Sequence, residues 1–218
     1  MSNIEAVIWD MDGVLVDTGE FHFQSWQEAL AAHDISLSRE GFQATFGMNN
    51  KGILQTLMGD RYADELIGEI GDPKEARFRE AIQGKLEMLP GARALLEALH
   101  DLEVPMAIGS SAPVANIEAI VNALEIGGYF QAQVSGATMP GKPDPSVFLT
   151  AARELGIDPA HCLVIEDALA GIAAARAAGM KVIAVTTTYP AEELRDAQPN
   201  LVVTTLEELD AERVLNIQ

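Results

Sequence analysis

Short, continuously apolar segments alternate with helical patterns along most of this chain, and this alternation strongly limits the possible folds. Unbroken apolar runs are typical of strands that are covered on both faces. Their alternation with helices predicts βαβ units, in which crossover helices join parallel strands. The expected strands are 6–9, 104–108, 162–165, 181–185 and the weaker 201–203, and the expected helices are 92–99, 114–124, 145–155, 168–178 and 206–215.

The segment that follows the first apolar run has a different character. From about residue 18 to 86 the apolar residues, such as Phe23, Trp26 and Leu30, recur only at helical spacing. Leu89-Pro90-Gly91 then punctuates the return to alternation. We therefore expect an α/β fold, with a Rossmann-like parallel sheet, helices on both faces and an all-helical cap domain inserted after strand one. The expected boundaries are 1–17 and 88–218 for the core and 18–87 for the cap.

The charge balance excludes several classes of partner. The 218 residues include 33 acidic and 14 basic side chains, a net charge of −19. Such a surface repels nucleic acids and anionic membranes, so an anionic ligand would need a metal ion or a few focused cations. Residues 1–5 show no signal-peptide pattern and no apolar run reaches about 20 residues, so the cytoplasm is the expected location. The single cysteine, Cys162, excludes an internal disulfide. We expect a monomer or a weak homo-oligomer.

Two aspartates follow the first predicted strand directly, in the sequence Asp10-Met11-Asp12-Gly13. Alternation along an extended chain places Asp10 and Asp12 on one side, at the strand end where open α/β sheets bind ligands. Buried carboxylates are costly unless a partner compensates them. Gly13 permits a sharp turn that brings the backbone close to a ligand. The alternative is an ordinary polar turn at Asp12 and Gly13.

Two later loops carry groups that suit an anion. Ser110 and Ser111 follow the second strand and precede a helix, where hydroxyls and free backbone N–H groups can bind phosphate. The alternative is that Ser111 caps this helix, with Pro113 in its first turn. Lys142 lies between Gly141 and Pro143, and a cation in so stiff a loop could neutralise a phosphoryl group. The alternative is a solvated loop lysine.

A second acidic pair, Glu166-Asp167, ends the apolar run at 162–165. Oxygen ligands from two strand ends suit Mg²⁺, which is usually held by one or two carboxylates together with substrate phosphate and water. The sequence therefore predicts Mg²⁺ as the cofactor. The alternative is that Asp167 caps the helix that follows.

Taken in order, these groups resemble the motifs of the haloacid dehalogenase superfamily of aspartate-dependent phosphotransferases. Asp10-x-Asp12-Gly13-Val14-Leu15-Val16-Asp17-Thr18 is similar to its first motif, Ser110 to the second and Lys142-Pro143 to the third. Glu166-Asp167-x-x-x-Gly171 is similar to the fourth. The resemblance covers nearly the whole chain, including the helical insertion.

The resemblance implies a mechanism. Asp10 would attack phosphorus and form an aspartyl-phosphate, and Asp12 would act as general acid and then as general base. Mg²⁺ would be held by Asp10, the backbone carbonyl of Asp12 and Asp167, with Glu166 close by or ligating through water. The catalytic set would be completed by Ser110 and Lys142, which would hold the phosphoryl oxygens.

The insertion resembles the cap of the β-phosphoglucomutase subgroup at Thr18-Gly19-Glu20-Phe21-His22-x-x-x-Trp26. The candidate substrate-binding residues are Gly13, His22, Trp26, Asn50, Lys74 and Ser111. Two departures count against a mutase. Where the mutase carries Lys-Gly-x-Ser-Arg, this chain reads Phe46-Gly47-Met48-Asn49-Asn50, with Lys51 as a possible substitute cation. Where the mutase reads Ser-x-Ser-Lys, this chain reads Ser110-Ser111-Ala112-Pro113.

A mutase must bind two phosphate groups in turn, whereas a phosphatase needs one phosphate site. The preferred reading is therefore a Mg²⁺-dependent phosphatase that hydrolyses a small phosphorylated metabolite, such as a sugar phosphate, through an aspartyl-phosphate. The alternative is a β-phosphoglucomutase-type phosphosugar mutase. A more remote alternative is a non-catalytic phosphoacceptor module, although such modules are shorter and lack a helical insertion after strand one.

Overall fold

The computed structural model describes residues 4–217, so residues 1–3 and Gln218, the two ends of the expected core, lie outside the described chain. Its strands form one parallel sheet in the order β3-β2-β1-β4-β5-β6. This sheet confirms the predicted α/β fold class. The strands are β1 (Ala6–Trp9), β2 (Met106–Ser110), β3 (Ala132–Ser135), β4 (Cys162–Glu166), β5 (Lys181–Val185) and β6 (Leu201–Val203).

Helices cover both faces of the sheet, as the unbroken apolar strands predict. Val7 and Trp9 of β1 face one side, where they join a core formed with α5 and α6. Ala6 and Ile8 face the other side and pack with α7 and α8. The helices on the two faces are α5 (Ala92–Asp101), α6 (Val114–Leu124) and α10 (Ala211–Leu215) on one, and α7 (Ser146–Leu155), α8 (Leu169–Ala177) and α9 (Ala191–Asp196) on the other.

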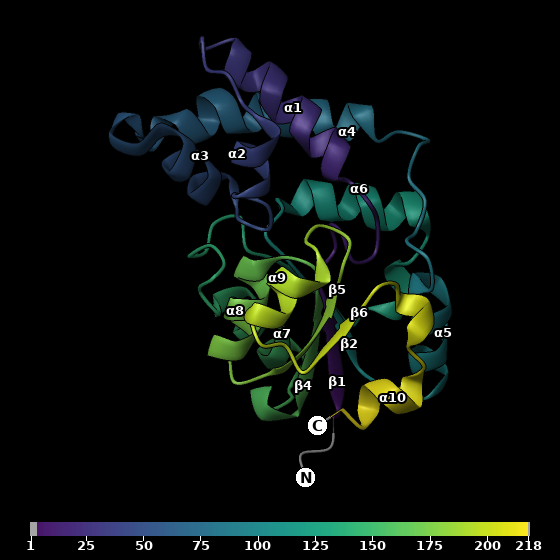
Figure 1. Cartoon of the computed structure of the whole chain (residues 1–218). Helices are drawn as coiled ribbons and strands as arrows, with labels where there is room; N and C mark the ends of the chain where they lie inside the picture. Colours follow the sequence, from purple (N-terminus) through teal and green to yellow (C-terminus); the bar gives the residue numbers. More distant parts are fainter. Residues whose placement is uncertain (1–3, 218) are drawn as a thin grey trace.

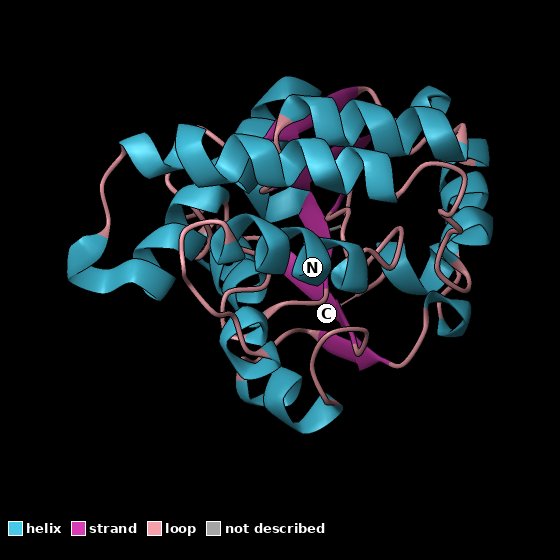
Figure 2. Cartoon of the chain, turned by 90° about the horizontal axis from the view of Figure 1, so that it is seen from above, coloured by secondary structure: helices cyan, strands magenta, loops and turns pink. Residues whose placement is uncertain are grey.

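Between β1 and α5 the described chain contains helices and turns but no strand of the sheet, which agrees with the predicted helical insertion. Its helices lie across the carboxyl ends of the strands (Figures 1 and 2). Phe23, Trp26 and Leu54 belong to a separate apolar cluster within it. The exact domain boundaries stay a prediction. The α-helices of this insertion are α1 (Gly19–Ala31), α2 (Arg39–Gln43), α3 (Asn50–Met58) and α4 (Asp72–Ala81).

The structure corrects the sequence prediction at three places. The second strand begins at Met106, two residues later than predicted, and extends to Ser110, where Ser110 pairs with Ser135 of β3. Strand β3 was not expected, because it is an edge strand in which Val134 alone is buried. The single helix expected over 206–215 is broken, because Asp210 accepts from the backbone N–H of Arg213 at 2.7 Å and starts a new helix.

No helix in the described part of the chain is both long enough and apolar enough to cross a membrane.

Candidate active site

Asp10 stands at the end of the central strand β1, with β2 on one side and β4 on the other. Its backbone N–H donates to Ile165 O at 3.0 Å, which ties the strand end to β4. The chain then turns back, with Gly13 N donating to Val16 O at 2.8 Å. The side chain of Asp10 is buried, with 4% of the residue exposed. The ends of parallel strands meet at one edge of the sheet, and this places Asp10 beside the residues that follow β2 and β4.

A cluster of buried carboxylates lies at this edge. Ligand atoms of Asp10, Glu166 and Asp167 all lie within 4.8 Å of one another. Lys142 donates from Nζ to Asp10 Oδ1 at 2.9 Å and to Glu166 Oε1 at 2.7 Å. Only 3% of Lys142 is exposed, so the alternative of a solvated loop lysine is wrong. Three carboxylates thus face one ammonium group, and the cluster is short of positive charge.

The pKa values of the cluster express this imbalance. Burial and the charges of Glu166 and Asp12 together raise the pKa of Asp10 to about 7, against the opposing effect of Lys142. Burial also raises the pKa of Asp167, with Glu166 and Asp10 adding to the effect. Burial alone would lower the pKa of Lys142, but Asp10 and Glu166 raise it overall. An added cation would stabilise the ionised form of every carboxylate in the cluster.

The carboxylate oxygens of the cluster suit a divalent metal ion as ligands. Both oxygens of Glu166 are engaged, Oε1 by Lys142 and Oε2 by the backbone N–H groups of Asp167 and Ala168, each at 2.7 Å. Asp167 Oδ2 accepts from the hydroxyl of Thr188. Within the described chain, Asp167 Oδ1 is buried and has no hydrogen-bond partner. An unpartnered buried carboxylate oxygen beside Asp10 is the arrangement that a hard cation completes.

Two glycines make room for these carboxylates. A Cβ on Gly13, where φ is +81°, would lie 1.9 Å from Asp167 Oδ2. A Cβ on Gly171 would lie 1.6 Å from Glu166 Oε1. The absence of a side chain at Gly13 therefore leaves space for the carboxylate of Asp167. Gly13 is not among the residues that line the pocket described below. Gly171 of the fourth motif is required for a steric reason, because the buried Glu166 side chain occupies the space that a Cβ would need.

We expect Gly171→Ala to lower the free energy of unfolding by roughly 1–3 kcal/mol, because the methyl group would displace a buried, fully hydrogen-bonded carboxylate. In an ordinary helix the same change stabilises by up to about 1 kcal/mol. Gly52→Ala in α3 is the matched control, since its Cβ would meet its nearest neighbour at an ordinary 3.4 Å. Chemical denaturation of both variants measures the effect. Equal stability of the two variants would contradict this reading of Gly171.

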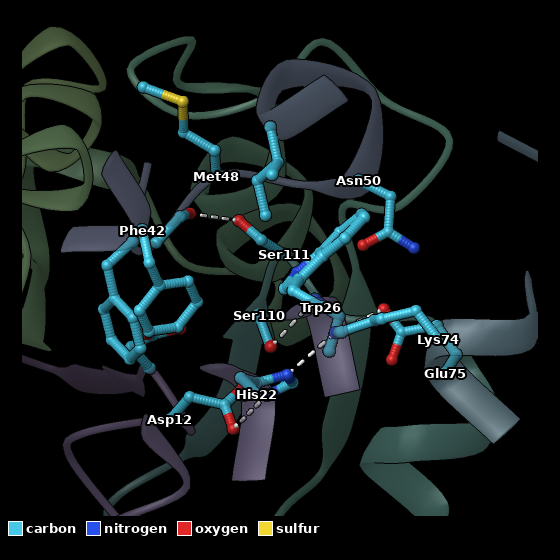
Figure 3. A pocket seen from close by; sticks show the side chains of 15 residues that line it. Asp12, His22, Trp26, Phe42, Met48, Asn50, Lys74, Glu75, Ser110 and Ser111 are labelled. Carbon is cyan, nitrogen blue, oxygen red and sulfur yellow. Dashed lines mark hydrogen bonds and ion pairs between the residues drawn. The ribbon is translucent and has the colours of Figure 1, made fainter. Parts of the chain in front are cut away.

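Asp12 lies apart from the cluster, although it follows Asp10 by two residues. Its Oδ1 accepts from the hydroxyl of Thr18 and lies 3.2 Å from His22 Nε2 (Figure 3). Lys74 Nζ lies 2.8 Å from the other ring nitrogen, Nδ1. Burial raises the pKa of Asp12, but His22, Thr18 and Lys74 together lower it, so the net shift is downward. The two aspartates of the first motif therefore have opposite environments, a pattern typical of paired acid–base roles.

Eight of the predicted residues line one pocket between the sheet and the helices above it, a space of about 510 Å³ that is open to solvent (Figure 3). Lys142, Glu166 and Asp167 are not among the residues that line it and lie buried beside Asp10. The roles that the sequence assigns to these residues stay predictions. The predicted residues that line the pocket are Asp10, Asp12, His22, Trp26, Asn50, Lys74, Ser110 and Ser111.

The pocket also contains residues that the sequence analysis did not select for the site. Glu75 binds Lys74, with Nζ to Oε1 at 2.9 Å. The signal that could have found it is a carboxylate next to a lysine on a mostly buried helix face. The remaining new lining residues form a largely apolar wall, and apolar helix residues carry no readable code for a site. They are Phe42, Phe46, Gly47, Met48, Ile53 and Ala112.

Lys51 does not replace the missing mutase cations in this structure. Its Nζ lies 3.2 Å from Asp64 Oδ1, its side chain is 47% exposed, and it is not among the residues that line the pocket. Asn50 lines the pocket in its place. Asn49 instead caps α3 and donates from Nδ2 to Gly136 O and Met139 O, each at 3.0 Å.

The two serines have different partners. Ser110 Oγ accepts from Ala112 N at 3.1 Å and lines the pocket. Ser111 Oγ donates to Gly47 O at 2.7 Å, which joins the loop after β2 to the helical insertion. Helix α6 begins after Pro113 without a side-chain cap, so the alternative that Ser111 caps it is wrong.

In the metal-free protein we expect Asp10→Asn to be stabilising, by an amount that grows as the pH rises. The folded-state pKa of Asp10 is about 7, above the ordinary value of 3.8. Such a group contributes stability that is fully present below pH 3.8 and is lost as the pH rises to about 7. Asparagine escapes this loss, which is on the order of 2–4 kcal/mol. Denaturation of both proteins with chelator at about pH 5 and pH 7.5 tests this, and a difference independent of pH would contradict it.

Comparison with known proteins places this site in a family. A model of haloacid dehalogenase-like hydrolases matches residues 4–179. The chain is 34% identical to the beta-phosphoglucomutase of Bacillus subtilis over 86% of this chain and 85% of that protein. It is 32% identical to the fructose-1-phosphate phosphatase YqaB of Escherichia coli, over 83% of this chain and 95% of that protein.

A solved structure shares the whole fold. The beta-phosphoglucomutase of Clostridium difficile superposes with a TM-score of 0.87 at 27% identity, covering 97% of this chain and 95% of that one. The relatives therefore include both a mutase and a phosphatase, and the name of each refers to a phosphorylated sugar. The buried acidic cluster, the pocket above it and the match over residues 4–179 lead to one conclusion: the chain is an enzyme that belongs to the haloacid dehalogenase-like hydrolase family.

Proposed function

We propose that this protein is a Mg²⁺-dependent phosphatase that hydrolyses a small phosphorylated sugar or polyol through an aspartyl-phosphate. One observation carries the proposal. Asp10 and Asp12 line the same pocket in opposite electrostatic environments, Asp10 in the carboxylate cluster with Lys142 and Asp12 beside His22. This is the division that a nucleophile and a separate acid–base group require.

In the first step an oxygen of Asp10 attacks phosphorus while the bond from phosphorus to the leaving oxygen breaks. Asp12 gives a proton to that oxygen, so that an alcohol leaves. The free protein holds Asp12 ionised, but a phosphate group beside it adds negative charge and raises its pKa, which favours the protonated acid. In the second step the Asp12 carboxylate takes a proton from water, which attacks the aspartyl-phosphate and frees Asp10 and phosphate.

The remaining polar groups position the phosphoryl group. Lys142, held between Asp10 and Glu166, supplies a fixed positive charge behind the nucleophile. Ser110 presents its hydroxyl at the end of β2. A divalent ion held by Asp10, Asp167 and the carbonyl of Asp12 would supply positive charge that lets one anion attack another. Stabilisation of this kind is strongest where charge spreads over the transferring oxygens.

The residues at 18–87 act, in this proposal, as a cap that opens and closes over a core of 1–17 and 88–218. The two parts are joined by hydrogen bonds, which can break and re-form, and by apolar packing of Phe46 and Phe78 against the core. Ser111 binds Gly47 O, and Asn49 binds two carbonyls of the loop after β3. Opening releases the alcohol and admits water, on the microsecond-to-millisecond timescale of such gates.

The side of the pocket that the cap forms favours hydrolysis over the mutase reaction. A mutase needs a cation there for a second phosphate group. Lys74 is buried and is already bound to Glu75 and His22, while Lys51 is turned to Asp64. The mutase remains the second candidate, because a relative of that name is 34% identical and because His22 and Lys74 do meet at the pocket.

A substrate panel tests the proposal. Fructose 1-phosphate, β-glucose 1-phosphate, hexitol phosphates and phosphoglycolate are incubated with Mg²⁺, with and without glucose 1,6-bisphosphate, and free phosphate and isomerised sugar are both measured. We expect phosphate release without any need for the bisphosphate. Conversion of β-glucose 1-phosphate to glucose 6-phosphate faster than phosphate release would promote the mutase. Stoichiometric phosphorylation without turnover would favour the phosphoacceptor module.

We expect activity to depend on Mg²⁺ and Ca²⁺ to inhibit. Mg²⁺ requires a tight octahedral shell, whereas Ca²⁺ accepts more ligands at longer distances and would misplace Asp10 for attack. Turnover with p-nitrophenyl phosphate is measured after chelation and after each metal is restored. Full activity in excess chelator would remove the metal from the proposal.

A further inference from the structure

An amide from the core lies between two opposite charges of the cap. Glu75 and Arg79 are one turn apart on α4, the i, i+4 spacing at which such residues form an ion pair. Asn116 of α6 stands between them: its Nδ2 donates to Glu75 Oε2 at 2.6 Å, and Arg79 Nη1 donates to its Oδ1 at 2.8 Å. Across residues 4–217, the salt bridge of Glu75 is with Lys74 alone.

Asn116, Glu75 and Lys74 are shielded from water. Asn116 is fully buried, and the exposed fractions of Lys74 and Glu75 are 2% and 4%. An ionised group in such a place is costly unless it is paired and hydrogen-bonded. Burial lowers the pKa of Lys74 despite the charge of Glu75, and Arg79 adds to the lowering. The ammonium form of Lys74 therefore depends on keeping Glu75 as its partner.

Arg79, Asn116, Glu75, Lys74 and His22 form a row of hydrogen-bonded groups, and the hydrogen bonds of this row have a defined direction. A guanidinium group only donates, so Asn116 must turn its carbonyl to Arg79 and its NH₂ group to Glu75. Glu75 then accepts from both Asn116 and Lys74. Lys74 Nζ lies 2.8 Å from His22 Nδ1, and because an ammonium group can only donate, Nδ1 is the acceptor. A ring nitrogen that accepts carries no proton, so the proton of His22 is on Nε2, the atom that faces Asp12 (Figure 3).

We propose that Asn116 is a positioning residue, which inserts its amide between Glu75 and Arg79 and thereby keeps the Nε2–H of His22 directed at Asp12. Its effect on Asp12 as acid and base rests on the proposed function, whereas its effect on the His22 tautomer does not. When the cap moves away from α6, Asn116 stays with the core, and Glu75 is then free to pair with Arg79. The row is thus complete only while the cap is closed.

Asn116→Leu tests this, because leucine has a similar volume and cannot hydrogen-bond. Without the amide we expect Arg79 to pair with Glu75 directly and to draw it away from Lys74. Removing the competitor as well, in the double variant Asn116→Leu/Arg79→Leu, should return Glu75 to Lys74. Arg77→Leu in the same background is the matched control, because Arg77 lies on the same helix and pairs with Glu28 at 3.4 Å.

The first readout is the tautomer of His22, measured by ¹⁵N NMR of the ring nitrogens and assigned with His22→Gln. It requires no activity, so it remains informative if the proposed function fails. We expect the Nε2–H form in the wild type and in Arg79→Leu, a mixture of tautomers in Asn116→Leu, and recovery in the double variant. Asn116→Ala, which leaves a cavity and adds no bulk, should behave like Asn116→Leu. A tautomer that stays unchanged in both Asn116 variants would overturn the proposal.

The second readout separates positioning from a merely structural role. Asn116→Leu should slow hydrolysis of fructose 1-phosphate, whose leaving alkoxide needs a proton, roughly tenfold more than hydrolysis of p-nitrophenyl phosphate. Arg79→Leu in that background should restore most of this ratio, and Arg77→Leu should not. Equal slowing of both substrates, or equal rescue by both arginine variants, would reduce Asn116 to a packing residue.

Discussion

Replacement of Asp10 by asparagine is expected to abolish turnover, with a loss of roughly 10⁴-fold or more, while the fold is kept. The amide retains the shape of the side chain and can still accept from Lys142, which binds Asp10 Oδ1. It is, however, a poor nucleophile towards phosphorus. Because one charge leaves a cluster of three carboxylates around a single ammonium group, the free energy of unfolding should hold or rise.

The measurement is steady-state hydrolysis of p-nitrophenyl phosphate with Mg²⁺, beside thermal unfolding of the same samples. Glu20→Gln is a suitable control, because Glu20 pairs with Arg39 on the surface of the cap and lies outside the pocket lining. A residual rate above a few per cent for Asp10→Asn, with the control unchanged, would assign the nucleophile elsewhere.

Replacement of Asp12 by asparagine should separate the two chemical steps. With a sugar phosphate we expect kcat to fall by about 10²–10⁴-fold, because the leaving alkoxide receives no proton. With p-nitrophenyl phosphate the leaving group needs little protonation, so the first step is partly spared. The second step still lacks its base, and the aspartyl-phosphate should accumulate.

Stopped-flow absorbance should therefore show a burst of nitrophenol close to one equivalent of enzyme, followed by a slow steady state. Acid quenching should recover phosphate bound to the protein. Asp10→Asn serves as the control, since it removes the acceptor and should give no burst. Similar slowing of both substrates without a burst would mean that Asp12 has no part in proton transfer.

The fold and the chemical groups of the site were largely predictable, because both depend on local patterns. An apolar run followed directly by Asp10 and Asp12 is typical of a strand in a parallel sheet whose carboxyl end binds a ligand. The same holds for the run before Glu166 and Asp167. Edge strand β3 escaped prediction for the same reason, since one buried residue among four makes no pattern. The break at Asp210 escaped because a capping aspartate differs little from any other aspartate in the sequence.

The sequence by itself determined the kinds of groups that meet at the strand ends and the inserted helical segment above them. Only the tertiary structure decided how those groups are divided, with Asp10 facing Lys142 and Asp12 facing His22. It also placed Asn116, which no motif marks, between two charges of a helix that precedes it by about forty residues. The physical reason is that a strand end is encoded by its neighbours in the chain. A buried charge takes its properties instead from whichever distant residues are packed around it.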